Sequence, residues 1–255
     1  MLRTNTLKAR LKAGEPCLGT FLNFPSPHVV ELAGICGLDF VCVDAEHGPM
    51  GPWEAEGLVR AANAANIVPI VRVAQNLPQV ILQYLDAGAL GVQMPMINTV
   101  GDAELAVASV KYYPEGRRGL AGVRAASYGI GPALSDYVVE ANAQTMLITH
   151  VETLQAIDAL PQVLKLDAID VIFIGPTDLS QSMGFPGRPN EPAVQEVIDR
   201  TIKQILDGGK AVGTICRDGE HARQLIDKGV TYLLGNVNLF LGNAFKQFVK
   251  TGRGG

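Results

Sequence analysis

The sequence predicts a single-domain (β/α)8 barrel. Short apolar runs alternate with amphipathic stretches along all 255 residues, and eight such strand–helix units fit this length. The runs are apolar on both faces, as in parallel strands that helices cover. No Pro/Gly-rich linker divides the chain. A doubly wound sheet is the alternative, but no Gly-x-Gly-x-x-Gly motif opens a helix after the first strand, so the barrel is favoured.

The elements follow in order. We expect strands at 17–22, 40–45, 68–73, 91–96, 145–151, 169–174, 211–216 and 231–236. Helical patterns occupy 28–37, 53–65, 77–87, 101–111, 153–164, 191–207, 218–228 and 239–250. Residues 1–8 are expected to form a short amphipathic helix. The irregular stretch 113–132 carries five glycines, which is typical of a functional or interface loop. The tail 251–255 is expected to be disordered.

Composition narrows the class of protein. An apolar content of 47% suits a large core, and a net charge of −4 without a basic run argues against nucleic-acid binding. No apolar run approaches the ~20 residues of a membrane helix, and the N-terminus lacks the apolar core of a signal peptide. The four cysteines, Cys17, Cys36, Cys42 and Cys216, match no zinc or redox spacing, and a cytoplasmic location is expected. All except Cys36 lie in apolar strand-like runs, so we expect those three thiols to be buried.

Two carboxylates follow successive apolar strands. Glu152 ends the run that begins at Met146, and Asp178 follows the run 171–174 after a Gly-Pro turn. Barrel enzymes carry their chemistry at the carboxyl ends of the strands, and adjacent strands lie about 4.8 Å apart. The two carboxylates can therefore share a hard divalent cation: Mg²⁺, Mn²⁺ or Co²⁺ more than Zn²⁺. Alternatively, each carboxylate caps the helix that follows it.

His47 follows the second strand and two acidic residues. A carboxylate beside it would raise the basicity of its imidazole and fix the tautomer, which suits a general base. Asp86, at the end of the helix after the third strand, is one candidate partner. Asp44 and Glu46 are nearer in sequence and equally suitable, and a purely structural histidine is the other interpretation.

Arg72 lies within an otherwise apolar strand, where an unpaired guanidinium would be costly. It either pairs with Asp44 or Glu46, or it awaits an anionic substrate or a developing enolate. No lysine stands at the carboxyl end of any expected strand. A Schiff-base mechanism needs such a lysine, so a metal is the expected electron sink.

At these positions the chain resembles the HpcH/HpaI class II pyruvate aldolases. The resemblance runs from about Leu18 to Phe248. The motifs that carry it are Asp44-x-Glu46-His47, Val71-Arg72-Val73, Leu85-Asp86-x-Gly88, Val92-x-x-Pro95, Tyr113-Pro114-x-Gly116-x-Arg118-Gly119, Val151-Glu152-Thr153 and Phe173-Ile174-Gly175-Pro176-x-Asp178-Leu179-Ser180.

The resemblance implies roles by position. Glu152 and Asp178 match metal ligands, His47 the base, and Asp86 the carboxylate that tunes it. Arg72 matches the arginine that stabilises the pyruvate enolate. The pyruvate carboxylate would be held by the loop Gly175, Pro176, Thr177 and Asp178. The family also implies a homo-oligomer, a hexamer built as a trimer of dimers, with C-terminal helices exchanged between subunits.

His150 departs from the family pattern, which has Gln two residues before the metal-binding Glu. His150 can donate the same hydrogen bond to substrate, bind the metal as a third ligand, or shift the metal preference towards softer ions. Near the last strand, Asn236 and Asn238 stand where the family often has Asp, and the sequence assigns them no role.

The expected activity is reversible retro-aldol cleavage of a 4-hydroxy-2-oxo acid to an aldehyde and pyruvate, or a close 2-oxo acid such as hydroxypyruvate. The alternatives are a citrate-lyase-like or macrophomate-synthase-like enzyme that uses the same metal-bound enolate, and a barrel that binds a 2-oxo acid without chemistry. In each case the expected ligands are small molecules rather than nucleic acid or membrane.

Overall fold

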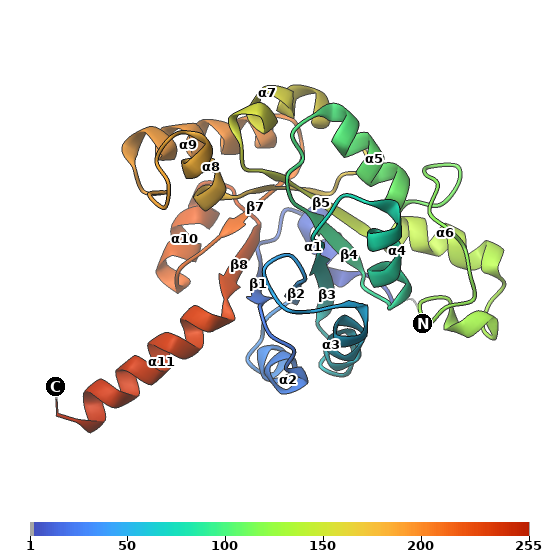
Figure 1. Ribbon diagram of the computed structural model, residues 1–255, viewed down its shortest axis with the longest axis horizontal. Coiled ribbons are helices and arrows are strands. Elements are labelled where there is room, and N and C mark those ends of the chain that lie inside the picture. The colour runs from blue at the N-terminus through green and yellow to red at the C-terminus, as the bar shows by residue number, and fades with distance from the viewer. Residues whose placement is uncertain (1–2, 255) are drawn as a thin grey trace.

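The computed structural model describes residues 3–254 and confirms the barrel. Its parallel strands close in sequence order, with β1 beside both β2 and β8 (Figure 1). The strands are β1 (Cys17–Leu22), β2 (Phe40–Asp44), β3 (Val68–Arg72), β4 (Gly91–Met94), β5 (Met146–Val151), β6 (Val171–Ile174), β7 (Ala211–Ile215) and β8 (Tyr232–Asn236). Each lies within its expected range.

Helices alternate with the strands, and most of them lie on the outer face of the barrel (Figure 1). They are α1 (Thr6–Lys12), α2 (Pro27–Ile35), α3 (Pro52–Ala64), α4 (Pro78–Asp86), α5 (Val100–Val110), α6 (Leu134–Gln144), α7 (Leu154–Val163), α8 (Pro176–Ser182), α9 (Pro192–Asp207), α10 (Gly219–Asp227) and α11 (Val237–Gly252), with a 3-10 turn η1 (Ser127–Gly129). No helix within residues 3–254 is long and apolar enough to span a membrane.

Local chemistry sets the start of many helices. The side chains of Ser26, Thr153 and Asp218 accept hydrogen bonds from the first turns of α2, α7 and α10. Proline stands in the first turn of several others, where its missing N–H costs nothing. These signals explain why the expected boundaries lie within a few residues of the observed ones.

Aromatic rings fill the interior of the barrel. Phe40 and Tyr232 stack with centroids 4.5 Å apart, and Phe173 meets Tyr232 edge-on. Glycines in the strands make room for these rings. A Cβ on Gly19 would lie 2.6 Å from the Phe40 ring, and one on Gly213 would lie 2.8 Å from Tyr232. A second apolar layer packs between the strands and the helices.

Four segments differ from the expected layout. The sequence analysis assigned no element to residues 133–144, which form α6, and it treated Thr177 and Asp178 as loop, whereas they lie in α8. Helix α11 extends to Gly252, so the first two residues of the expected disordered tail are helical, and Gly255 lies outside the described residues. Of the expected N-terminal segment, Met1 and Leu2 also lie outside them, and α1 starts at Thr6.

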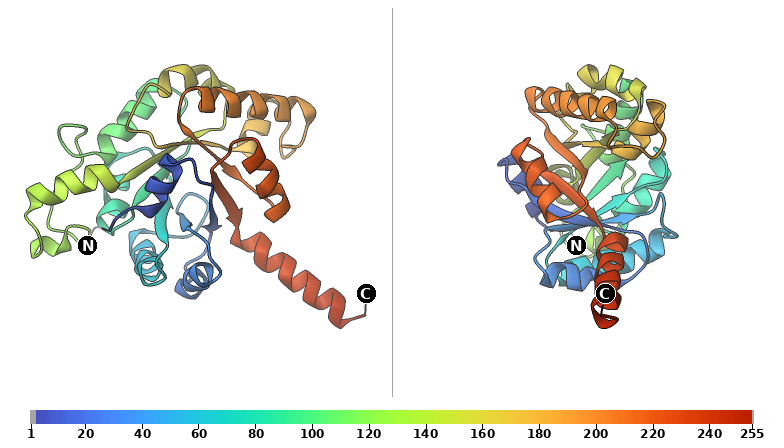
Figure 2. Two further views of the ribbon diagram at one scale, coloured as in Figure 1. Left: turned by 180° about the vertical axis from the view of Figure 1, so that it is seen from behind. Right: turned by 90° about the vertical axis from the view of Figure 1, so that its left-hand side faces the viewer.

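Helix α11 leaves the barrel instead of packing against it (Figures 1 and 2). Its apolar side chains are open to solvent in the single chain: Phe245 is 66% exposed and Phe248 79%. Such a helix would normally bury its apolar stripe. Exchange of this helix between subunits stays a prediction.

Candidate active site at the carboxyl end of the barrel

Arg72 is held by a buried carboxylate at the carboxyl end of the barrel. Asp44 and Arg72 are direct neighbours across β2 and β3. Arg72 Nε donates to Asp44 Oδ1 at 2.9 Å and Nη2 donates to Oδ2 at 2.6 Å, a bidentate pair. Burial alone would raise the pKa of Asp44, but the hydrogen bonds and charge of Arg72 lower it on balance. Asp44 therefore stays ionised and fixes the guanidinium.

Glu46 and His47 lie beside this pair. Arg72 Nη1 is 3.3 Å from Glu46 Oε2, and the same oxygen is 3.8 Å from His47 Nε2. Burial raises the pKa of Glu46 in spite of the attraction of Arg72 and His47. The His47 side chain is 63% exposed. The imidazole is therefore accessible from solvent, with a carboxylate nearby.

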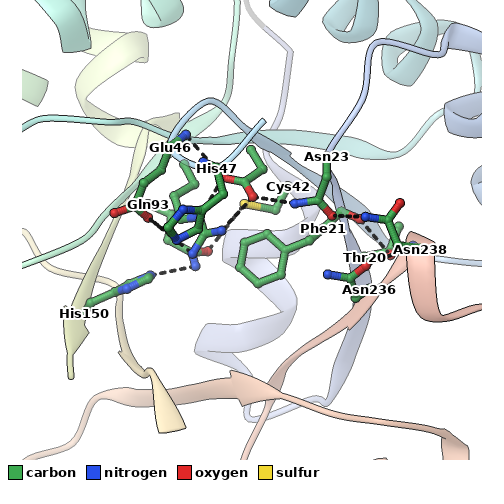
Figure 3. Close-up of polar contacts among 12 residues, drawn as sticks. Thr20, Phe21, Asn23, Cys42, Glu46, His47, Gln93, His150, Asn236 and Asn238 are labelled. Atoms are coloured by element: carbon green, nitrogen blue, oxygen red, sulfur yellow. Dashed lines mark hydrogen bonds and ion pairs between the residues drawn. The ribbon is translucent and has the colours of Figure 1, made fainter. Parts of the chain in front are cut away.

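Further contacts fix the Arg72–Asp44 unit from the side of β1. The Arg72 guanidinium lies over the Phe21 ring, 4.4 Å from its centroid. Asn23 Nδ2 donates to Asp44 Oδ2 at 2.6 Å, and Asn238 Nδ2 donates weakly to Asn23 Oδ1 at 3.4 Å. Figure 3 shows this polar connection from α11 toward β2.

Asn236 has a structural role that the sequence left open. Its side-chain oxygen accepts from the Asn238 N–H at 2.9 Å and so caps α11. The two asparagines therefore begin the C-terminal helix and link it to the site.

Glu152 is a buried carboxylate with both oxygens engaged. Oε1 accepts from the Met96 N–H at 2.6 Å, and Oε2 lies 2.7 Å from His150 Nδ1. Burial would raise the pKa of Glu152, but His150, the Met96 N–H and Arg72 lower it on balance. A Cβ on Gly175 would lie 2.8 Å from Oε2, so the glycine leaves room beside the carboxylate.

Asp178 lies in the first turn of α8, with an exposed side chain. No hydrogen bond or ion pair joins it to Glu152 among residues 3–254. Nor does this part of the chain contain three or more His, Cys, Asp or Glu side chains grouped to hold a metal. The buried Glu152 and the exposed Asp178 still supply the oxygen ligands that a hard cation prefers, because Mg²⁺-type sites use few protein ligands and fill the rest with water and substrate.

Asp86 lies apart from His47 in the single chain. Its carboxylate pairs with Arg118 Nη2 at 2.8 Å, and it borders an outer cleft with Trp53 and Tyr128. No hydrogen bond or ion pair connects Asp86 to His47 within the described residues. The His47 imidazole instead lies 3.8 Å from the Glu46 carboxylate, and the His47 N–H donates to Asp44 Oδ1 at 3.2 Å, so His47 contacts both of the alternatives that the sequence left open.

The sequence assigned no role to two buried polar residues, Gln93 and Tyr232, that the structure connects to the site. Gln93, fully buried at the end of β4, contacts His150, and Tyr232, the first residue of β8, contacts Gln93. Gln93 could have been identified from the sequence, because it is a polar residue near the carboxyl end of an apolar strand. Tyr232 gave none, because a tyrosine at the start of an apolar strand is indistinguishable from a core residue.

The fold and the site together define a parallel α/β barrel with an acidic, arginine-containing centre at the carboxyl ends of β2, β3 and β5. That is the position at which barrel enzymes carry their active sites.

The chain belongs to the HpcH/HpaI aldolase/citrate lyase family, whose model matches residues 18–240. It is 36% identical over 238 residues to a hydroxypyruvate/pyruvate aldolase of Sagittula stellata, covering 93% of each chain. It is 34% identical to a 4-hydroxy-2-oxo-heptane-1,7-dioate aldolase of Escherichia coli, covering 93% of this chain and 90% of that one. A crystal structure of a family protein from Burkholderia cenocepacia superimposes with a TM-score of 0.92 at 33% identity, covering 98% of this chain and all of that one (100%).

Proposed function

We propose that this protein is a metal-dependent aldolase that cleaves a 4-hydroxy-2-oxo acid to an aldehyde and pyruvate, or a close 2-oxo acid such as hydroxypyruvate. The observation that carries the proposal is the fixed Arg72 guanidinium near an ionised Glu152 at the mouth of the barrel. Relatives named as aldolases of this kind support it.

No lysine among residues 3–254 stands at the carboxyl end of a strand, where a Schiff-base mechanism would need one. The buried lysine among residues 3–254 is Lys111, and its Nζ donates to the carbonyl oxygens of Asn142 and Thr145. Thr145 directly precedes β5, so Lys111 lies at the amino end of the barrel, opposite the proposed site. The electron sink must therefore come from elsewhere.

Glu152 and Asp178 are the proposed ligands of a divalent cation: Mg²⁺, Mn²⁺ or Co²⁺, with Zn²⁺ less suited to an all-oxygen set. When bound, such a cation supplies Lewis-acid polarisation of the keto group of the substrate. Because Gly175 has no Cβ, the Glu152 carboxylate can pack against it, and the Met96 N–H and His150 orient that carboxylate.

The start of α8 is the proposed site for the substrate carboxylate. Pro176 has no N–H, and Gly175 N–H donates to the Val151 carbonyl oxygen at 3.2 Å. The N–H groups of Thr177 and Asp178 stand in the first turn of the helix, where no earlier carbonyl of that helix can accept from them. They are therefore available to an anion.

In the cleavage direction His47 takes the proton of the 4-hydroxyl group. The C3–C4 bond then breaks, its electron pair forms the enolate of the 2-oxo acid, and the aldehyde leaves. Nε and Nη2 of Arg72 are bound to Asp44, so Arg72 stabilises the developing negative charge through Nη1, which carries a second N–H beside the one that faces Glu46 at 3.3 Å. Protonation of C3 by the conjugate acid of the base completes the reaction.

We also propose a homo-oligomer, a hexamer built as a trimer of dimers, in which a second chain covers α11. Support comes from the family resemblance and from the exposed apolar residues Phe245 and Phe248. The family resemblance pairs Asp86 with His47, whereas the two lie apart within the single chain, so we propose that the assembly brings Asp86 of one subunit to His47 of another. Mixing inactive His47→Ala with inactive Asp86→Ala subunits after reversible dissociation would then restore part of the activity, whereas each variant mixed with itself would not.

A cytoplasmic location is proposed as well. All four cysteines are free, and Cys36 is exposed, which suits a reducing compartment. Fractionation of the native host, with thiol labelling of Cys36, tests this.

The aldolase proposal is tested by pyruvate release from 4-hydroxy-2-oxoheptanedioate, before and after EDTA treatment. We expect activity that chelation abolishes and Mg²⁺, Mn²⁺ or Co²⁺ restores. Full activity in the chelated protein would refute metal dependence. Exchange of the pyruvate methyl hydrogens with deuterium, without aldehyde release from any hydroxy-oxo acid, would point to a related lyase or decarboxylase. Pyruvate binding without deuterium exchange would indicate a barrel that binds a 2-oxo acid but catalyses no reaction.

A further inference from the structure

A buried chain of hydrogen bonds runs across the barrel interior and ends at Glu152. Tyr232 Oη donates to Gln93 Oε1 at 3.0 Å, the Gln93 amide nitrogen lies 2.8 Å from His150 Nε2, and His150 Nδ1 lies 2.7 Å from Glu152 Oε2. These residues come from β8, β4, β5 and the position after β5, and each is at most 4% exposed. Figure 3 shows the link between Gln93 and His150.

The donors at the Tyr232 end of this series of hydrogen bonds determine which atom donates and which accepts along it. Gln93 Oε1 faces both the Tyr232 hydroxyl and the Cys42 thiol, whose Sγ lies 3.6 Å away. Burial raises the pKa of Cys42, so the sulfur keeps its proton. With two donors facing the amide oxygen, the amide NH₂ group of Gln93 points at His150 Nε2.

His150 Nε2 is therefore an acceptor, and the ring proton sits on Nδ1, where it is donated to Glu152. The Phe173 ring stacks on the imidazole with centroids 4.8 Å apart and restricts its plane. Both ring nitrogens of His150 are thus committed to protein partners, and neither is left for a metal ion.

We infer that His150 is a positioning residue: it orients Glu152 for the cation through Nδ1–H, and the buried pair Gln93–Tyr232 holds its imidazole in that role. The inference rests on the proposed function and resolves which of the roles open to His150 the residue takes. It predicts that Tyr232, which touches neither substrate nor metal, acts on cation binding through two intervening side chains. Outer partners of metal ligands commonly act in this way.

Mn²⁺ binding to the metal-free protein, followed by electron paramagnetic resonance of the free ion, tests the chain of bonds. We expect His150→Leu to weaken binding roughly 10- to 100-fold, and His150→Gln to lose much less because its amide still donates. Tyr232→Phe should weaken binding roughly threefold to tenfold. Tyr84→Phe is the matched control, since its hydroxyl contacts the Met50 carbonyl oxygen at 3.3 Å, outside this chain.

Electron–nuclear coupling in the Mn²⁺-loaded protein separates positioning from ligation. We expect no directly bound imidazole nitrogen. A nitrogen coupling that disappears in His150→Gln would make His150 a ligand and overturn the inference while leaving the metal site intact. Mn²⁺ binding by Tyr232→Phe equal to that of wild type would overturn the part assigned to Tyr232. If the wild type bound no Mn²⁺, or if Glu152→Gln bound it equally well, the proposed metal site itself would fail, and this inference with it.

A second readout needs no metal. In protein labelled with ¹⁵N-histidine, the signals lost in His150→Gln identify the His150 ring. We expect a protonated Nδ1 and an unprotonated Nε2 in the wild type, and a shift towards a tautomer mixture in Tyr232→Phe but not in Tyr84→Phe. A protonated Nε2 in the neutral wild-type ring would overturn the direction of the chain.

Discussion

Replacing Asp44 by Asn removes one charge while keeping the shape of the side chain. Asp44 is fully buried, and the Arg72 side chain is 12% exposed. The variant therefore leaves a nearly buried guanidinium without its bidentate partner. Glu46 remains 3.3 Å from Arg72 Nη1 and compensates in part.

The expected loss of stability follows from this geometry. Removing one partner of a buried ion pair typically costs 3–5 kcal/mol, and the remaining contact with Glu46 places Asp44→Asn near the lower limit, at about 3 kcal/mol. For a chain of this size that corresponds to a fall in Tm of roughly 6–12 °C. Asp199→Asn is the control: its ion pair with Lys228 is about half exposed, so we expect a loss below about 1 kcal/mol.

Urea unfolding at pH 7 measures both variants. The pKa of Asp44 is lowered in the folded protein, so its stabilising effect is complete above its unfolded pKa of about 4 and disappears as the pH falls through the folded pKa. The gap between wild type and Asp44→Asn should therefore shrink below about pH 4. A loss at pH 7 no larger than that of Asp199→Asn would refute the view that Asp44 fixes Arg72.

Two further predictions concern Gly175 and Lys111. Gly175→Ala places a methyl group 2.8 Å from Glu152 Oε2, so Mn²⁺ affinity should fall at least about tenfold. Gly57→Ala is the control, because open space surrounds that position, and it should bind Mn²⁺ like wild type. Equal affinities in all three proteins would contradict the role assigned to Gly175. Burial lowers the pKa of Lys111 to about 8, with a smaller contribution from a neighbouring lysine. The folded state therefore binds fewer protons than the unfolded state between about pH 8 and the unfolded pKa of about 10.4. Stability relative to Lys111→Met should rise over that range by up to about 3 kcal/mol in urea unfolding, and a flat difference would contradict the burial of the ammonium group.

The strands were predictable because each is a short apolar run bounded by turn residues. Helix α6 was missed for a tertiary reason. Asn142 in that helix accepts from the Tyr112 N–H at 2.8 Å and donates to the Tyr112 carbonyl oxygen at 3.0 Å. Its buried face packs on a small apolar cluster that includes Tyr112 and Tyr137. Residues 30 positions apart thus supply what stabilises the helix, and no local pattern records it.

The candidate site likewise has residues that the sequence indicated and contacts that only the structure identified. Polar residues at the ends of apolar strands indicated Arg72, His47, Glu152 and Asp178 directly, because the carboxyl ends of parallel strands meet at one edge. The sequence named candidate partners for Arg72 and His47 but could not choose among them. Arg72 had two acidic candidates and in fact contacts both, while Asp86, chosen for His47, pairs with Arg118.

The sequence by itself determined the barrel, its strand order and the acidic, lysine-free character of its mouth, since these depend on local hydrophobic periodicity and on which residue types end each strand. Only the tertiary structure decided which side chains touch. The register of β2 against β3 joins Asp44 to Arg72, and barrel closure brings Tyr232 of β8 to Gln93 of β4 and so to His150. Those contacts join residues 28 to 139 positions apart. They depend on how neighbouring strands pair and on how the sheet closes into a barrel, which no single stretch of the chain encodes.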